Sequence, residues 1–176
     1  MNRFNMLAFV SLGLLAGSGT ARAAVIEYSA PLRGLNESPP NASPGTGIAN
    51  VFTDSAAFTV HVVVSFSGLT APASAAHIHC CTAVPGIGNI GVFLGLTGFP
   101  SATAGAYDHT FVLSSAAFST LDFGMAAGRA YVNIHTSLFP SGEIRGFLAP
   151  VPEPGSLALV GAGVLALIAV RRRHAG

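Results

Sequence analysis

Hydrophobic and polar residues alternate along the middle of the chain, most regularly between positions 58 and 67. There the even positions carry Phe or Val, and most of the odd positions carry Thr, Ser or His. Because successive side chains of a strand point to opposite faces, this pattern predicts an antiparallel strand with one buried face. Further strands are predicted at 25–35, 48–54, 75–81, 90–96 and 107–113. Pro31 predicts that the first of them lies at a sheet edge or carries a bulge.

A β-hairpin is predicted at residues 131–148. Two alternating segments, 131–136 and 143–148, flank the sequence Phe-Pro-Ser-Gly, which is rich in turn residues. One face of this hairpin is apolar and is expected to join the core; it consists of Val132, Ile134, Ile144 and Leu148. The other side chains are polar or aromatic: Tyr131, Asn133, His135, Glu143 and Arg145. Glu143 and Arg145 are expected to form a solvated ion pair worth under about 1 kcal/mol, with a binding surface as the alternative.

These elements together predict the fold class. Ser114 and Ser115 precede Ala-Ala-Phe, which predicts a helix N-terminus and one or two helical turns ending near Gly124. Seven or eight short strands with turn residues between them indicate an all-β fold, an antiparallel β-sandwich with at most one short helix. Apolar helices are expected to flank this domain, which is predicted to cover residues 24–150.

The chain carries few charges. Among its 176 residues are 8 Arg, no Lys and 7 acidic residues, which gives a net charge of +1. Three of the Arg lie together at 171–173, so the basic patch that nucleic-acid binding requires is missing and no nucleic-acid partner is expected. Plentiful Val, Ile, Leu and Phe predict a packed core rather than a disordered chain.

Residues 1–23 predict a secretory signal peptide. Arg3 supplies a positive start, residues 6–16 form an apolar run, and Ala-Arg-Ala at 21–23 fits a small-x-small cleavage site. Signal peptidase is therefore an expected partner during export. An uncleaved anchor helix is the alternative, but the apolar run is shorter than the about 20 residues of a membrane span.

The C-terminal segment, residues 151–176, has a different composition. In order, it contains Pro152, Glu153 and Pro154, an apolar run at 157–170, and Arg171, Arg172 and Arg173. An apolar helix followed by a basic stop is typical of a transmembrane segment whose basic end stays cytoplasmic, although 14 residues are few for a span. An ordinary tail anchor is one interpretation.

The order Pro-Glu-Pro, apolar helix and Arg cluster resembles the PEP-CTERM sorting signal of Gram-negative bacteria. The resemblance implies that an exosortase, an integral membrane protease, recognises and removes the tail. It also implies an exported protein, with a precursor transiently in the inner membrane and a mature form at the cell surface or outside the cell. Proteins sorted in this way are associated with biofilm and exopolysaccharide production.

Three motifs between residues 26 and 149 resemble the CHRD domain, a β-domain named from chordin. They are Leu-Arg-Gly-Leu-Asn-Glu-Ser-Pro-Pro at 32–40, Ser-Gly-Leu-Thr at 67–70 with Ala-His-Ile-His at 76–79, and Tyr-Val-Asn-Ile-His-Thr at 131–136 with Pro-Ser-Gly-Glu-Ile-Arg-Gly at 140–146. The motifs follow the family order. The resemblance implies a non-enzymatic extracellular role in matrix or partner binding. The chain departs from the family at Cys80 and Cys81, where Gly-Pro is common.

Histidine is the residue type with potential chemistry. His77 and His79 are two positions apart on a predicted strand, so both imidazoles leave the same face. His135 lies on another strand, and if the strands adjoin, the three imidazoles converge as ligands for zinc or copper. His109 is a distant candidate for a fourth ligand. Alternatively, these histidines bond to the backbone or to Glu143 and order the hairpin, with no cofactor required.

Cys80 and Cys81 are the two cysteines of the chain. Export to an oxidising compartment favours a disulfide. Adjacent cysteines can close a vicinal disulfide, although they do not reach the usual spacing of the two Cα atoms. A disulfide between them is predicted; two buried thiols, or a metal site shared with His79, are the alternatives.

No catalytic motif is present. The sequence has no nucleophile elbow, no H-E-x-x-H and no P-loop, and its acidic residues are scattered, so no enzyme is expected. We expect an exported, non-enzymatic module of the cell surface or extracellular matrix that binds exopolysaccharide or another surface protein, or that serves as a structural component. The alternative is a copper- or zinc-binding protein with a redox or metal-buffering role. Convergence of His77, His79 and His135 would favour the alternative.

Overall fold

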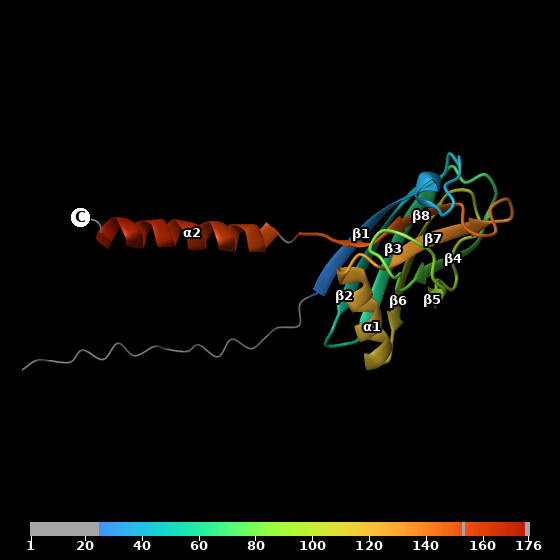
Figure 1. Ribbon diagram of the computed structural model, residues 1–176. Coiled ribbons are helices and arrows are strands. Elements are labelled where there is room, and N and C mark those ends of the chain that lie inside the picture. Colours follow the sequence, from blue (N-terminus) through green and yellow to red (C-terminus); the bar gives the residue numbers. More distant parts are fainter. Residues whose placement is uncertain (1–24, 153, 175–176) are drawn as a thin grey trace, which may run out of the picture.

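The computed structural model describes residues 25–152 and 154–174, in which nine strands and two α-helices are present (Figure 1). The strands are β1 (Val25–Arg33), β2 (Thr46–Asp54), β3 (Thr59–Ser67), β4 (Ala73–His79), β5 (Val92–Gly95), β6 (Gly105–Val112), β7 (Tyr131–Thr136), β8 (Ile144–Phe147) and β9 (Ala149–Pro150). The helices are α1 (Ser115–Ala126) and α2 (Pro154–His174), and a 3-10 turn, η1, covers Gly34–Asn36. The predicted signal peptide, residues 1–23, lies outside the described residues.

All nine strands belong to one sheet. Their order is β5-β4-β7-β8-β1-β2-β3-β6, with β9 alongside β1, and every pairing is antiparallel. β1, β2 and β3 pair along their whole length. In contrast, β1 and β8 share a single residue pair, Arg33 with Arg145. This weak joint divides the sheet into two halves, one from β5 to β8 and one from β1 to β6.

The two halves of the sheet enclose one hydrophobic core. Val51 and Val62 reach it from one half, and Ile78 and Ile134 reach it from the other. A single sheet brings both sets of side chains into one cluster by curling over them, as the ribbon in Figure 1 shows. The predicted all-β, antiparallel fold class is confirmed.

The apolar face predicted for the hairpin is also confirmed. Val132, Ile134, Ile144 and Leu148 are fully buried in the core. The even positions of β3 are buried as well, from Val60 to Phe66. The period of two in the sequence therefore predicted correctly which side of these strands faces inward.

Pro31 does not mark an edge strand. β1 lies inside the sheet, with β2 on one side and with β9 and β8 on the other. The pairing with β9 involves Tyr28 and Ser29, and the pairing with β8 involves Arg33. Pro31 falls between these two short ladders, so its missing N–H interrupts neither of them.

Helix α1 begins as predicted but is longer, with 12 residues. Ser114 is its N-cap, and the Ser114 hydroxyl accepts a hydrogen bond from the Ala117 N–H at 3.2 Å. Phe118, Leu121 and Met125 are buried against the core. Because short helices gain most of their stability from such packing, these contacts explain the additional turn.

Helix α2 contains the apolar run predicted to cross the membrane, residues 157–170. Within the parts of the helices that the structure describes, no stretch is long and apolar enough to span a bilayer. The predicted transmembrane segment is therefore not found. Its uninterrupted apolar run counts 14 residues, against the about 20 that a span requires.

Replacing Ile134 with Asp should lower the free energy of unfolding by about 3–5 kcal/mol, because a carboxylate would enter the apolar core without a partner. Ile48→Asp is the matched control, since Ile48 lies on β2 with 45% of its surface exposed. Urea unfolding followed by circular dichroism measures both. Equal midpoints for the two variants would contradict the assignment of the faces.

Candidate metal centre

Three histidines meet on the outer face of the sheet, on the side opposite the apolar core. His77 and His79 lie on β4, and His135 lies on β7, which pairs with β4. The register of the two strands places His77 directly opposite Asn133. Residues two positions apart share a face of a strand, so the three imidazoles emerge on the same side. The structure therefore brings the three predicted residues together.

The ring nitrogens lie close enough to bind one metal ion together. One nitrogen from each of the three rings lies within 4.8 Å of the other two. The Nδ1 of His77 is 3.0 Å from the Nε2 of His135. Two nitrogens bound to a tetrahedral zinc ion at about 2.0–2.1 Å are roughly 3.3 Å apart. Small rotations of the side chains would thus give a coordination geometry.

Two backbone carbonyls determine which nitrogen of His79 and His135 carries a proton. The carbonyl of Ile90 lies 2.7 Å from the Nδ1 of His79, and the carbonyl of Pro140 lies 2.9 Å from the Nδ1 of His135. Because a carbonyl can only accept, each Nδ1 donates, and the neutral ring then keeps its lone pair on Nε2. Metal-binding histidines commonly hold their second N–H in this way.

The cluster favours uncharged imidazoles. Burial lowers the pKa of His77, and the neighbouring His135 and His79 lower it further. Burial also lowers the pKa of His135; the hydrogen bond to Pro140 opposes this effect, and His79 adds to it. Neutral imidazole is the form that binds a metal ion, so the environment prepares the cluster for coordination.

A stack of side chains holds the ring of His79. It lies parallel to the ring of Tyr131, with centroids 4.7 Å apart, and the guanidinium of Arg145 lies over the Tyr131 ring at 4.8 Å. His79 comes from β4 and Arg145 from β8, the strands on either side of β7. The stack leaves His79 only 8% exposed and fixes the plane of its ring.

Glu143 and Arg145 do not form the predicted solvated ion pair. Both are buried, and each has other partners. Arg145 lies 3.7 Å from the carboxylate of Glu37 and donates to the Asn36 carbonyl, the Gly88 carbonyl and the Asn89 side chain. The prediction was wrong because two loops cover this face of the sheet, and strand periodicity carries no information about such a cover.

Glu37 is a buried carboxylate beside the histidines. Among the described residues its Oε1 has no hydrogen-bond partner. Burial raises the pKa of Glu37 to about 7, although Arg145, the backbone of Ser38 and the amide of Asn133 act in the opposite direction. Asn133 also reaches the cluster, since its Oδ1 lies 3.1 Å from the Nε2 of His79. A buried polar layer thus runs from Glu37 through Asn133 to the histidines.

Glu143 is a fully buried carboxylate with four hydrogen-bond donors around it. Its Oε1 accepts from the Ser43 hydroxyl at 2.6 Å and from the Thr70 N–H at 2.7 Å. Its Oε2 accepts from the hydroxyls of Thr70 at 3.0 Å and Thr136 at 2.6 Å. Burial alone would raise the pKa of Glu143, but these bonds outweigh it and hold the pKa below its usual value. The carboxylate joins two loops to the end of β7.

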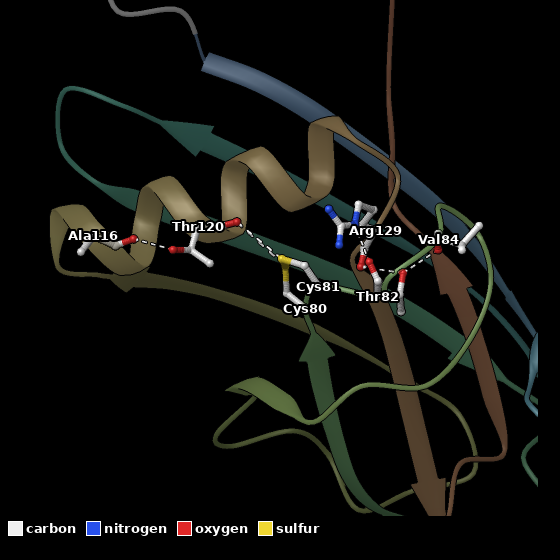
Figure 2. The surroundings of a disulfide bond; sticks show 7 residues. All are labelled: Cys80, Cys81, Thr82, Val84, Ala116, Thr120 and Arg129. Carbon is white, nitrogen blue, oxygen red and sulfur yellow. Dashed lines mark hydrogen bonds between the residues drawn. A yellow bond between two sulfur atoms is a disulfide. The ribbon is translucent and has the colours of Figure 1, made fainter.

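Cys80 and Cys81 follow directly after His79. Figure 2 shows their sulfurs joined in a disulfide that points toward Thr120 of α1. Gly124 of the same helix makes room for it, since a Cβ at that position would collide with both sulfurs. With the sulfurs bonded to each other, neither cysteine offers a thiolate to a metal ion at His79.

The other predicted residues lie away from the histidine cluster. His109 is exposed on β6, at the far end of the strand order from β4, and does not join the cluster. Pro152 is exposed just before α2, Pro154 is the first residue of that helix, and Arg171–Arg173 belong to its last turn. Glu153 lies outside the described residues.

Asn133 and Glu37 were missed as members of this site. Asn133 could have been found, because it shares a face with His135 and stands between His135 and Tyr131 on one strand. Periodicity could not have found Glu37, since it lies in a Pro-rich loop; the signal that pointed to it was its place in the CHRD-like motif at 32–40.

Comparison with known families agrees with the motifs and with the all-β fold. Residues 28–148, more than half of the chain, match the CHRD domain. The chain belongs to the CHRD domain family. Residues 150–173 of this CHRD protein match the PEP-CTERM protein-sorting motif. The motif implies processing by an exosortase and indicates an exported protein that is membrane-anchored as a precursor and then surface-exposed. A search of curated proteins finds no match.

Replacing Glu143 with Gln should lower the free energy of unfolding by about 1–3 kcal/mol at pH 7, because the charged acceptor of four hydrogen bonds is lost. The folded-state pKa of Glu143 is lowered, so its contribution is present above the ordinary pKa of 4.5 and is lost as the pH falls through the folded value. Urea unfolding at pH 7 and at pH 3 measures this.

The difference between wild type and Glu143→Gln should therefore shrink in acid. Glu27→Gln serves as the control, because Glu27 is a half-buried carboxylate on β1. If the difference between wild type and Glu143→Gln is the same at both pH values, the ionised carboxylate is not what holds these loops.

Proposed function

We propose that this CHRD protein is a non-enzymatic module of the cell surface or extracellular matrix that binds one zinc or copper ion through His77, His79 and His135. The observation that carries the proposal is the convergence of three ring nitrogens within 4.8 Å. Two of these rings donate their second N–H to a carbonyl, which leaves a lone pair directed into the cluster.

A purely structural role explains these contacts less well. His79 is buried and His77 and His135 are half-buried, and the three rings share one hydrogen bond among themselves, between His77 and His135. Burial of polar groups is unfavourable unless their hydrogen-bonding capacity is used. A bound cation would use the lone pairs that the two carbonyls leave on the rings.

Metal binding is compatible with the role expected at the surface. Sorting by an exosortase delivers the domain to the cell exterior, where it can contact exopolysaccharide or another surface protein of a biofilm. We propose binding rather than catalysis, because the sequence has no catalytic motif and its acidic residues are scattered. The metal then either stabilises the module or is the ligand that the protein buffers.

Metal titration tests the proposal. The full chain, purified in mild detergent and stripped with a chelator, should bind one zinc or cupric ion, and saturation should raise the melting temperature. The triple variant of His77, His79 and His135 to Ala should lose this binding. Elemental analysis and isothermal titration calorimetry measure the stoichiometry and affinity.

The matched control is the double variant His61→Ala and His109→Ala, since both histidines lie on exposed parts of β3 and β6. It should bind as the wild type does. If the wild type binds no metal and the triple variant is only less stable, the histidines serve the fold and the proposal fails.

Replacing Pro152, Glu153 and Pro154 with Ala should leave the protein in the inner membrane, because the exosortase would no longer recognise the tail. Cell fractionation and immunoblotting measure the distribution between membrane and exterior. A variant with Ala at Gly155 alone, directly after the Pro-Glu-Pro triplet, controls for a general effect on helix α2. Release of the triple variant at the wild-type level would argue against exosortase sorting through this motif.

A further inference from the structure

Asn133 occupies the centre of the histidine cluster. It lies directly opposite His77 in the β4–β7 ladder, and His135 follows two positions later on the same strand. Its Oδ1 is 3.1 Å from the Nε2 of His79. The side chain is 3% exposed, so its amide must find its partners inside the protein. Asn133 therefore contacts or adjoins each of the three imidazoles.

The amide oxygen of Asn133 and the Nε2 of His79 are spaced like two ligands of one ion. The Nδ1 of His79 faces the Ile90 carbonyl, so the Nε2 is the ring nitrogen that faces Asn133. The Oδ1 of Asn133 lies 3.1 Å from this nitrogen. Two ligand atoms of a tetrahedral zinc ion at about 2.0–2.2 Å are roughly 3.3 Å apart. A metal ion can therefore bind both atoms.

The orientation of the Asn133 amide is set from the other side. A Cβ on Gly142 would lie 2.5 Å from the Oε1 of Glu37 and 2.6 Å from the Nδ2 of Asn133, so both atoms border the space that this glycine leaves open. Glu37 Oε1 is buried and has no partner among the described residues. An acceptor there attracts the NH₂ group of Asn133, which directs the amide oxygen toward the histidines.

We propose that the amide oxygen of Asn133 is the fourth ligand of the metal centre and that Glu37 is the positioning residue that aims it. This inference rests on the function proposed above and specifies the site further. Three imidazole nitrogens and one amide oxygen form a set that suits zinc or cupric ion. The set contains no sulfur, because Cys80 and Cys81 are bonded to each other, so cuprous ion is disfavoured.

Glu37 borders the amide nitrogen of Asn133. Its Oε1 is buried without a hydrogen-bond partner among the described residues, and the Nδ2 of Asn133 borders the same space beside Gly142. A bound metal ion polarises the amide and strengthens the Asn133 N–H as a donor, so we expect this N–H to form a hydrogen bond to Glu37 Oε1 when the ion binds.

The test compares Asn133→Ala, Asn133→Asp and the control Asn50→Ala in the full chain in mild detergent. Asn50 lies on β2, where it accepts a hydrogen bond from Ser29 and is distant in strand order from β4. Asn133→Ala should weaken zinc binding by about 10- to 100-fold while the stoichiometry stays at one ion per chain. Asn133→Asp, which keeps an oxygen, should bind zinc nearly as the wild type does.

Cobalt(II) provides a readout that a merely structural role would not change. Its absorption spectrum reports the atoms bound to the ion, so the visible bands should shift in Asn133→Ala but not in Asn50→Ala. Wild-type zinc affinity and an unshifted cobalt spectrum in Asn133→Ala would overturn the role of Asn133 and leave the three-histidine site standing.

Two further outcomes are decisive. Absence of metal binding by the wild type would overturn the metal centre itself, and the fourth ligand with it. If Asn133→Ala does not fold, Asn133→Leu takes its place, because Leu keeps the volume of the side chain and offers no ligand atom: a cobalt spectrum and a zinc affinity identical to those of the wild type would show that no atom of residue 133 binds the ion. Glu37→Gln should weaken zinc binding less than Asn133→Ala, because it acts only through the amide.

Discussion

A carboxylate without access to solvent ties together the loops around this sheet. Glu143 accepts hydrogen bonds from Ser43, Thr70 and Thr136, which lie in three separate parts of the chain. An ionised carboxylate is tolerated away from water only when its lone pairs are satisfied, so the folded state requires all three segments to be in place together. Thr136 ends the strand that carries His135, and the position of the histidine site depends on this network.

Side chains are consequently buried on both faces of the sheet. The curled sheet encloses the apolar core on its inner face, and loops cover a polar layer on the outer face of β4, β7 and β8. Ile90 and Pro140 contribute carbonyls to it, and Arg145 is held there by Glu37 and by backbone acceptors. A polar layer of this kind places imidazoles at fixed angles, which a solvated strand surface does not do.

The sequence predicts those parts of this arrangement that depend on local periodicity. The strands, their inward faces, the N-cap at Ser114 and the common face of His77 and His79 all follow from spacing along the chain. The neighbouring position of β4 and β7 is not local, because about fifty residues separate these strands. Burial of Glu143 and Arg145 and the contact of Asn133 with His79 depend on loops, whose paths are set by tertiary hydrogen bonds. The same reason explains why Pro31 was misjudged, since an edge is a property of the whole sheet.

The last strand of the domain ends one residue before the Pro-Glu-Pro triplet of the sorting motif. β9 pairs with β1 through Ala149 and Pro150, and the Val151 N–H donates to the Glu27 carbonyl at 2.8 Å. The next residue, Pro152, opens the Pro-Glu-Pro triplet of the sorting motif, whose match begins at residue 150. A membrane protease that cleaves near this triplet must therefore reach a site directly beside the folded domain, or must cleave before β9 pairs with β1. If the protease cleaves at the Pro-Glu-Pro triplet, the mature chain ends where the sheet ends, and no flexible linker separates the domain from its attachment point.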